Sequence, residues 1–263
     1  MNQHENIGAG GIPDWVTRVV SRVSASEGKS DSLNLNRDGN GLSYGIIQWT
    51  QRSGSLYKLL GSMQATDPAE FARVFGANHA TLLDVARRKS LDPVGGARLW
   101  DEPWVSRFKA AGRHPTFVAV QWALATRGEH FQGAEEVSRI LNIRTERAMT
   151  LFFDRSVHQG PTASKAVATR IRDRLTESGA ATVRYRDLLD AFARGMADRF
   201  RRTTRPESEV YSSGAPHVLW KQVGSEWHAI AGPWDLYETA IGRARRILDD
   251  PTLPDVPVDA AVA

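Results

Sequence analysis

Apolar residues recur at helical spacing along most of this 263-residue chain, and one short segment interrupts that pattern. The first stripe, Trp15–Val23, follows Pro13, a residue favoured in the first turn of a helix. Gly28 is a stop signal directly after Glu27, so we expect this helix to end there. Similar patterns predict further helices starting at Asp67–Pro68 and over Ala80–Lys89, Thr116–Thr126, Ala134–Leu141, Thr145–Val157, Ala163–Leu175, Tyr185–Arg201 and Trp234–Leu248.

The interrupting segment is Ser32–Trp49. Leucines alternate with polar residues at its start, and Asp38–Gly41 reads D-G-N-G, a strong turn signal. We therefore expect a β-hairpin or a small sheet here, and a second hairpin over Val218–Trp227. The chain is predicted to be mainly α-helical with a small β-hairpin or sheet.

Several kinds of chemistry are excluded by residues that the chain lacks. It has no cysteine, which removes disulfides, thiolate nucleophiles and cysteine-bound zinc. Its seven histidines show no metal-ligand spacing such as H-E-x-x-H, so we expect no metal. Neither a phosphate-binding G-x-x-x-x-G-K-[ST] nor a dinucleotide-binding G-x-G-x-x-G after a strand is present, and no cofactor is predicted.

Hydropathy and charge limit the partners. No stretch approaches the roughly 18 apolar residues of a membrane span, and the first residues do not resemble a signal peptide. The net charge is only +4, but residues 162–205 hold eleven basic side chains against five acidic ones. An anionic polymer is a candidate partner for such a segment, but a solvated helix face is the better explanation for most of these positions. No nucleic-acid-binding motif accompanies it, so we expect no nucleic-acid partner.

Two carboxyl groups stand out as candidates for acid–base chemistry. Glu27 lies in the last turn of an amphipathic helix, where partial burial is expected to raise its pKa. Asp38 lies among glycines in the following turn and is expected to stay ionised. Glycoside hydrolysis needs two carboxyls in such opposed environments. Taken alone, a solvated helix-end glutamate and a turn-forming aspartate account for the same pattern.

The segment Asp38–Ile47, D-G-N-G-L-S-Y-G-I-I, with Ser53–Gly54 downstream, resembles the active-site segment of the family 46 chitosanases. That family has a D-G-x-G-x-T-x-G-I-I pattern followed by a glycine-containing loop. The wider lysozyme superfamily shares the helix–Glu–hairpin arrangement more loosely. A later segment, Phe153–Gly160, looks like a helix of such enzymes, and in it Asp154 and His158 are spaced to pair and to brace a cleft wall.

The resemblance implies a lysozyme-like, two-lobed fold with a cleft between the helix end and the hairpin. It also implies roles: Glu27 as the general acid, Asp38 as the base that activates water in an inverting reaction, and Ser43 as the hydroxyl that holds this water. Glu27 and Asp38 are eleven residues apart, as in phage-type lysozymes and closer than in the chitosanases. Asp31 remains an alternative base.

Substrate binding is expected around the same segment. Tyr44 and Trp49 are candidates for stacking on sugar rings, with core packing as the alternative for Trp49, and Gln48 and Arg52 are candidates for hydrogen bonds to the sugar. The chitosanases place an acidic residue where this chain has Ser55. Without that carboxylate, a net-positive chain is better suited to peptidoglycan than to cationic chitosan.

We therefore expect a glycosidase that hydrolyses the glycan strands of peptidoglycan, such as an endolysin or a secreted effector. The alternatives are a chitosanase and a non-catalytic wall-binding or structural module. We expect a flexible N-terminus over residues 1–12, a lysozyme-like catalytic domain over 13–249 and an extended tail over 250–263. The chain is expected to be made in the cytoplasm and to reach the wall through an unidentified delivery partner.

Overall fold

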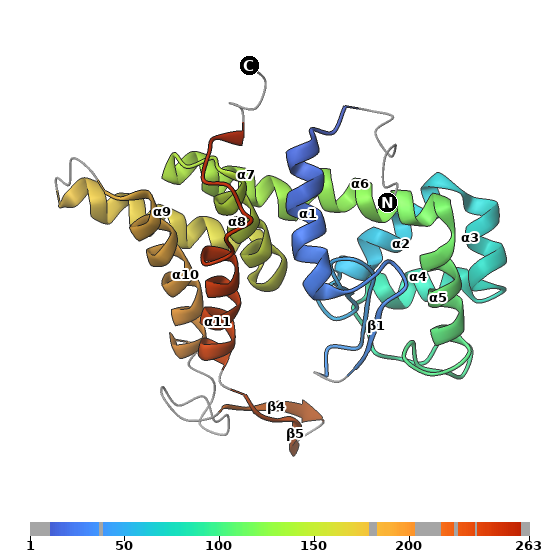
Figure 1. Cartoon of the computed structure of the whole chain (residues 1–263). Helices are drawn as coiled ribbons and strands as arrows, with labels where there is room; N and C mark the ends of the chain where they lie inside the picture. The colour runs from blue at the N-terminus through green and yellow to red at the C-terminus, as the bar shows by residue number, and fades with distance from the viewer. Residues whose placement is uncertain are drawn as a thin grey trace. The chain divides into compact units, whose positions relative to one another are not determined.

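The computed structural model describes residues 11–36, 39–178, 183–202, 217–223, 226–234 and 236–258. The chain divides into two compact units (Figure 1). The N-terminal unit comprises Met1–Thr17 and Ser21–Thr126, and the C-terminal unit comprises Arg18–Val20 and Arg127–Ala263. The elements, in chain order, are α1 (Asp14–Glu27), β1 (Leu33–Leu35), β2 (Leu42–Tyr44), β3 (Trp49–Thr50), α2 (Ser55–Thr66), α3 (Pro68–Phe75), α4 (His79–Arg87), α5 (Trp104–Arg113), α6 (Pro115–Arg127), α7 (Glu129–Leu141), α8 (Glu146–Gln159), α9 (Pro161–Glu177), α10 (Tyr185–Arg202), β4 (His217–Val223), β5 (Glu226–Trp234) and α11 (Leu236–Leu248).

The N-terminal unit contains a three-stranded antiparallel sheet in the order β1-β2-β3 and the helices α2 to α6. The register pairs Leu33 with Tyr44 and Ser43 with Thr50. Because β2 is the central strand, its residues are buried on both faces. Tyr44 stacks edge-on against Phe108 of α5, with ring centroids 5.0 Å apart, so the sheet joins the aromatic core of the unit.

The C-terminal unit is built on α8, whose residues from Glu146 to Ser156 are all buried. Helices α7, α9, α10 and α11 each contact it. The side chain of Arg147 fastens the residues that follow α11. It donates to the backbone carbonyls of Leu248 at 2.7 Å and Asp250 at 2.8 Å, and to the carboxylate of Asp255 at 2.6 Å. The start of the segment predicted as an extended tail is thus bonded to the core helix of this unit.

The predicted fold class is confirmed: the chain is mainly helical with a small antiparallel sheet. Helix α1 ends at Glu27 with Gly28 as its C-cap, and Asp67 caps α3 by accepting the Glu70 amide at 3.0 Å. The second predicted hairpin is present as β4 and β5, and its second strand runs on to Trp234. Two helices, α2 and α5, were not predicted. None of the described helices is long and apolar enough to cross a membrane.

Candidate active site

Glu27 is the last residue of α1 and is half-buried. The backbone turns immediately after it, because Gly28 has a φ of 142°, a value that L side chains rarely adopt. A Cβ on Gly28 would lie 2.5 Å from the Cβ of Ser32, so only glycine allows this close passage. The Ser32 hydroxyl accepts the Lys29 amide at 2.7 Å and closes the turn. The end of the helix is therefore tied directly to the start of β1.

Gln121, on α6, holds this turn against the sheet. Its side-chain amide donates to the Ser30 carbonyl at 2.9 Å and to the Tyr44 hydroxyl at 3.3 Å. Its oxygen accepts the Ile46 amide at 3.1 Å. Gly45 leaves the room for this approach, since a Cβ there would overlap the Gln121 oxygen. One neutral side chain thus links the residues after Glu27 to those after β2.

Gln51 performs a similar task at the other end of the sheet and is fully buried. Its oxygen accepts the Leu42 amide at 3.1 Å, and its nitrogen donates to the Ser90 carbonyl at 2.6 Å. A Cβ on Gly41 would lie 2.6 Å from that oxygen, so glycine is needed at this position as well. Gly41 of the D-G-N-G turn therefore allows the close packing of Gln51.

The predicted base, Asp38, lies outside the described residues, as does Arg37. The described residues on either side are held by Asn36. Its side-chain oxygen accepts the Gly41 amide at 2.8 Å, and its carbonyl accepts the Gly39 amide at 3.2 Å. The two ends of the loop that carries Asp38 are thus connected to one residue at the end of β1.

Ser43, the predicted water-positioning hydroxyl, is 3% exposed and lies opposite Thr50 in the sheet. The Thr50 hydroxyl donates to the Gln48 carbonyl at 2.9 Å. Since a carbonyl oxygen only accepts, Ser43 must be the donor in its 2.8 Å bond to Thr50. The lone pairs of the Ser43 oxygen remain able to accept a hydrogen bond.

Of the two predicted aromatic sugar platforms, Tyr44 is fully buried and Trp49 is 5% exposed. Burial raises the pKa of the Tyr44 hydroxyl far above its ordinary value, and the charge of Asp31 raises it further. This hydroxyl therefore stays protonated. Tyr44 is packed into the core of the unit because the central strand β2 is covered on both faces, and Trp49 on the edge strand β3 is buried as well.

Gln48 and Arg52, the predicted hydrogen-bonding residues, are more accessible. Gln48 is half-buried at a φ of 53°, and its side chain donates to the Gly45 carbonyl at 2.9 Å. Arg52 is exposed, and its backbone amide bonds the Asn40 carbonyl at 3.1 Å. The Arg52 guanidinium is thus presented to solvent at the edge of the small sheet.

Ser55 begins α2, and its hydroxyl accepts the Thr50 amide at 2.8 Å. The preceding residue, Gly54, has a φ of 85°, and a Cβ on it would lie 2.7 Å from the Cε of Lys89. The lysine side chain therefore passes over the turn that leads into Ser55. A cationic side chain thus lies beside the turn that precedes Ser55.

Asp31, the alternative base, forms an ion pair with Arg113, with its carboxylate 2.9 Å from the Arg113 Nε. Its side chain is 26% exposed. Gly112 lies against the same turn, since a Cβ there would lie 2.5 Å from the Asp31 Cα. Asp31 is thus fixed against the end of α5 with its charge balanced.

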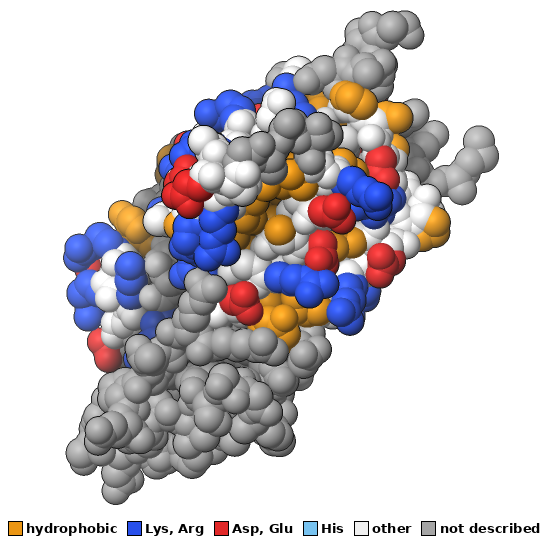
Figure 2. Space-filling model, turned by 90° about the vertical axis from the view of Figure 1, so that its left-hand side faces the viewer, with side chains coloured by type: hydrophobic (Ala, Val, Ile, Leu, Met, Phe, Trp, Pro, Cys, Tyr) orange, Lys and Arg blue, Asp and Glu red, His pale blue; other side chains and the backbone are white. Residues whose placement is uncertain are grey.

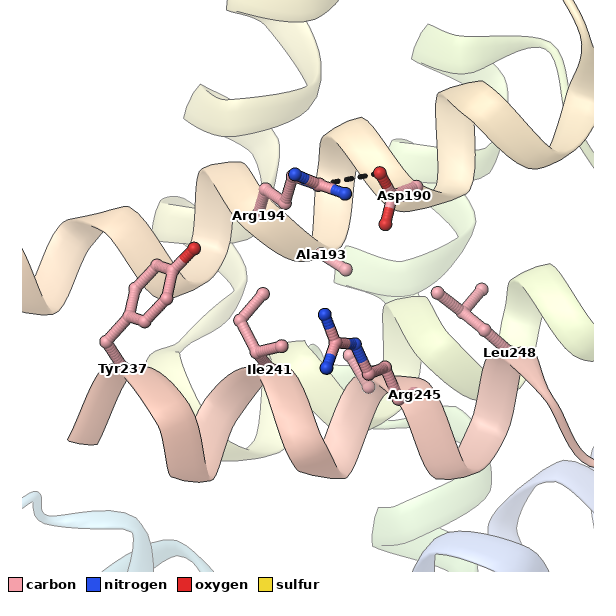
Figure 3. Close-up of a pocket in the computed structure, with 8 residues that line it drawn as sticks. Asp190, Ala193, Arg194, Tyr237, Ile241, Arg245 and Leu248 are labelled. Carbon is pink, nitrogen blue, oxygen red and sulfur yellow. Dashed lines mark hydrogen bonds and ion pairs between the residues drawn. The ribbon is translucent and has the colours of Figure 1, made fainter. Parts of the chain in front are cut away.

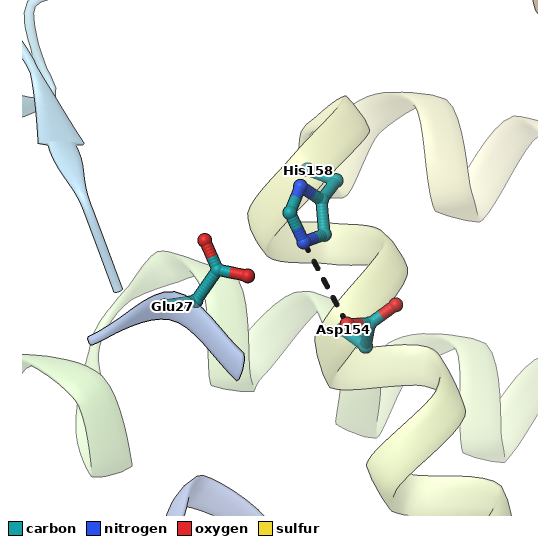
Figure 4. A group of neighbouring side chains, drawn as sticks. All are labelled: Glu27, Asp154 and His158. Carbon is teal, nitrogen blue, oxygen red and sulfur yellow. Dashed lines mark ion pairs between the residues drawn. The ribbon is translucent and has the colours of Figure 1, made fainter. Parts of the chain in front are cut away.

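The C-terminal unit contains the predicted Asp154–His158 pair, and the structure confirms it at 3.7 Å (Figure 4). The Asp154 carboxylate also bonds Arg155, and it accepts the Arg243 Nε at 2.6 Å. Burial opposes ionisation of Asp154, but the charges of Arg155, His158 and Arg243 outweigh it and hold its pKa below the ordinary value. Two guanidinium groups on one carboxylate disfavour a metal ion at that carboxylate.

The basic excess predicted over residues 162–205 can be examined on the described part of the surface. Arg170, Arg174 and Arg199 are exposed, while Arg172 and Arg194 pair with neighbouring aspartates. On the face drawn in Figure 2, acidic side chains are interspersed among the basic ones. This pattern is typical of a solvated surface rather than of a single-sign patch.

Gln51, Gln121 and Lys89 were not predicted as functional. Gln121 interrupts an apolar stripe formed by Phe117, Val120 and Ala125, which is a signal of a buried polar contact. Its partners lie 75 to 91 residues away in sequence, so no local pattern identifies them. Lys89 carries no sequence signal of its own.

No protein-family model matches the chain, and no curated protein matches its sequence. Solved chitosanases do match its structure. A native chitosanase of Bacillus subtilis gives a TM-score of 0.62 at 14% identity, covering 91% of this chain and 89% of that chain. A family 46 chitosanase of Gynuella sunshinyii, in complex with chitotetraose, gives 0.60 at 15% identity, covering 91% and 88%. A mutant of the Bacillus subtilis enzyme, in complex with six glucosamine units, gives 0.61 at 14% identity, covering 92% and 89%. The chain has the chitosanase fold.

Proposed function

We propose that the chain is a glycoside hydrolase that cleaves the glycan strands of peptidoglycan with inversion. The observation that carries the proposal lies in the N-terminal unit. Glu27 ends α1, and the residues that follow it are bonded through Ser32 and Gln121 to the sheet that leads into the Asp38 loop. The likeness of the fold to chitosanases supports the same chemistry.

In this reaction Glu27 protonates the leaving glycosidic oxygen, and Asp38 removes a proton from the attacking water. Inversion requires the two carboxyls to be about 6.5–9.5 Å apart, so that the water fits between base and sugar. Ser43 accepts one hydrogen of this water, because its own proton is directed to Thr50. The second hydrogen is then directed to Asp38, and an oxygen lone pair is left for the anomeric carbon.

Charge supports peptidoglycan as the substrate. Lys89 passes over the turn at Gly54, and Arg52 is exposed at the edge of the sheet. Both side chains repel the ammonium groups of chitosan and attract the lactyl and peptide carboxylates of the bacterial wall. Ser55 provides no carboxylate to reverse this preference.

The first experiment follows the clearing of a permeabilised Gram-negative cell suspension. Wild type should lower the turbidity, and Glu27→Gln should abolish the effect. Glu177→Gln is the matched control, since Glu177 is the exposed last residue of α9. Equal clearing by wild type and Glu27→Gln would refute Glu27 as the acid, and no clearing by either would refute the hydrolase and leave a wall-binding module.

The base is tested by two substitutions of the same kind. Asp38→Asn should remove nearly all activity, while Asp31→Asn should keep most of it, because Asp31 is already paired with Arg113. The reverse result would assign the base to Asp31. Mass spectrometry of the released fragments identifies the bond that is cut and separates a hydrolysed end from the anhydro end that a lytic transglycosylase leaves.

A chitosanase is the second candidate, because two of the matching structures hold glucosamine oligomers. The two candidates differ in the rate ratio on soluble chitosan and on peptidoglycan. Ser55→Asp together with Lys89→Gln should shift this ratio toward chitosan. Faster cleavage of chitosan by wild type would overturn the choice of peptidoglycan.

Because peptidoglycan lies outside the cytoplasmic membrane, the proposal includes delivery. A phage holin, a contractile secretion machine or fusion to an exported partner would each supply it. Expression in a Gram-negative host, with and without a periplasmic export signal, tests this: lysis is expected only when the chain is exported.

A further inference from the structure

A small pocket lies between α10 and α11 in the C-terminal unit, and no step of the proposed hydrolysis uses it (Figure 3). Its volume is about 80 Å³. One bound water needs about 10–15 Å³ by the same measure, so the pocket has room for a small organic group but not for a sugar ring. Its floor is apolar and buried, and is formed by Ala193, Ile241, Ala244 and Leu248.

The polar lining of the pocket carries an excess positive charge. Arg194 pairs with Asp190 on the same helix, with 2.7 Å between the Arg194 Nε and the carboxylate. Arg245 has no ion-pair partner within the described ranges of the chain. In Figure 3 the guanidinium of Arg245 points from α11 toward α10 and lies between Ile241 and Leu248. The fork of donors on this guanidinium is thus directed over an apolar floor.

We propose that this pocket binds a small apolar carboxylate, with the alanine-like end of a short peptide as the best fit. A guanidinium binds a carboxylate through two parallel hydrogen bonds, and Arg245 offers this geometry. The apolar floor accommodates a methyl group, and Tyr237 lines the outer end beside Arg194. The small volume excludes larger side chains. This inference does not depend on the proposed hydrolysis.

The test is an NMR titration of the full chain with propionate, N-acetyl-alanine and N-acetyl-alaninamide. We expect the two acids to bind saturably with dissociation constants in the millimolar range. The neutral amide should bind at least about tenfold more weakly than the acids. Tighter binding of N-acetyl-alanine than of propionate identifies a peptide end as the ligand. Equal binding of the two identifies a free small acid, and both results support the pocket.

Arg245→Gln should weaken binding of the acids about tenfold and should remove the preference for acid over amide. Arg246→Gln is the matched control, because Arg246 is the exposed neighbour on α11 and does not line the pocket. Thermal unfolding shows whether both variants are folded. Absence of saturable binding, equal binding of acid and amide, or equal weakening by the two substitutions would overturn the proposal.

Discussion

Gln51 and Gln121 of the N-terminal unit and Arg147 and Arg155 of the C-terminal unit are all buried polar side chains. The two glutamines bond only to neutral groups, namely backbone amides and carbonyls and the hydroxyl of Tyr44. The two arginines bond to carboxylates, and Arg147 also bonds to carbonyls at the end of α11 and directly after it. The two buried glutamines of the N-terminal unit therefore act through groups that do not titrate, and the Asp31–Arg113 pair of this unit is partly exposed, whereas the two buried arginines of the C-terminal unit depend on buried charge.

The largest effect is expected for Arg147→Ala. The Arg147 side chain is 5% exposed, and its removal leaves several carbonyls and Asp255 without their donor. Breaking a buried charged network in this way costs about 3–5 kcal/mol of unfolding free energy. This loss is measured by urea unfolding, with circular dichroism as the signal. The exposed Arg139→Ala on α7 is the control. An equal loss in both variants would contradict the role of Arg147.

A smaller loss, of about 2–3 kcal/mol, is expected for Gln121→Leu, because the Ser30 carbonyl and the Ile46 amide lose neutral partners. Hydrogen exchange should show faster exchange at Ile46. Gln132→Leu is the comparison, since Gln132 is exposed and donates to a single carbonyl. The loss should be the same at pH 5 and pH 8. A pH-dependent loss would remove the distinction between the two units.

Acid should loosen the C-terminal unit first. Burial opposes the charge of Asp255, but the hydrogen bonds from Arg147 and Tyr185 and the charges of Arg147 and Arg186 hold its pKa below the ordinary value. The pKa of Asp154 is lowered in the same sense. Each contributes stability above the unfolded pKa of about 3.9, and this stability is lost as the pH falls through the folded value.

The corresponding carboxyls of the N-terminal unit, Glu70, Asp84 and Asp92, pair with exposed arginines, where solvent screening makes the pairs weak. When the pH is lowered from 5 to 2, backbone amides of α8 and α11 should therefore lose their protection from hydrogen exchange at a higher pH than amides of the sheet. Asp255→Asn should weaken the pH dependence of amide protection in the residues around position 255. Earlier loss in the sheet would contradict the comparison.

The smallest effect is expected for Arg172→Gln. Arg172 pairs with Asp173 on the exposed face of α9. Both side chains are about half exposed, and such pairs rarely change stability measurably. A thermal midpoint indistinguishable from wild type would show that burial, rather than the number of charges, distinguishes the C-terminal unit.

The sequence predicts the long helices well, because their apolar stripes repeat over several turns. Helix α2 shows the same stripe through Leu56, Leu59, Leu60 and Met63, but it directly follows the Ser53–Gly54 turn, and no helix was predicted there. Helix α5 has few large apolar residues and a glycine in its last turn, so its periodicity is weak. Both misses concern helices that begin directly after a turn.

The candidate site could be predicted only in part. The positions of Glu27 and Ser43 follow from local patterns, since a helix end and a strand are local features. The burial of Tyr44 depends on β2 being the central strand, and that of Trp49 on what covers the edge strand β3; no local pattern contains that information. The approach of Lys89 to Gly54 is likewise a long-range contact.

The amide network around Gln121 has a consequence for enzymology. The hydrogen bonds that Gln121 makes around the turn after Glu27 involve no ionisable partner except the Tyr44 hydroxyl, which stays protonated. Titration within this amide network therefore adds nothing to a pH–rate profile, and Asp31, which pairs with Arg113, is the ionisable group of the turn that the Asp31→Asn variant removes from the profile. The two limbs of a bell-shaped pH–rate profile of that variant would then report the pKa values of the catalytic acid and base.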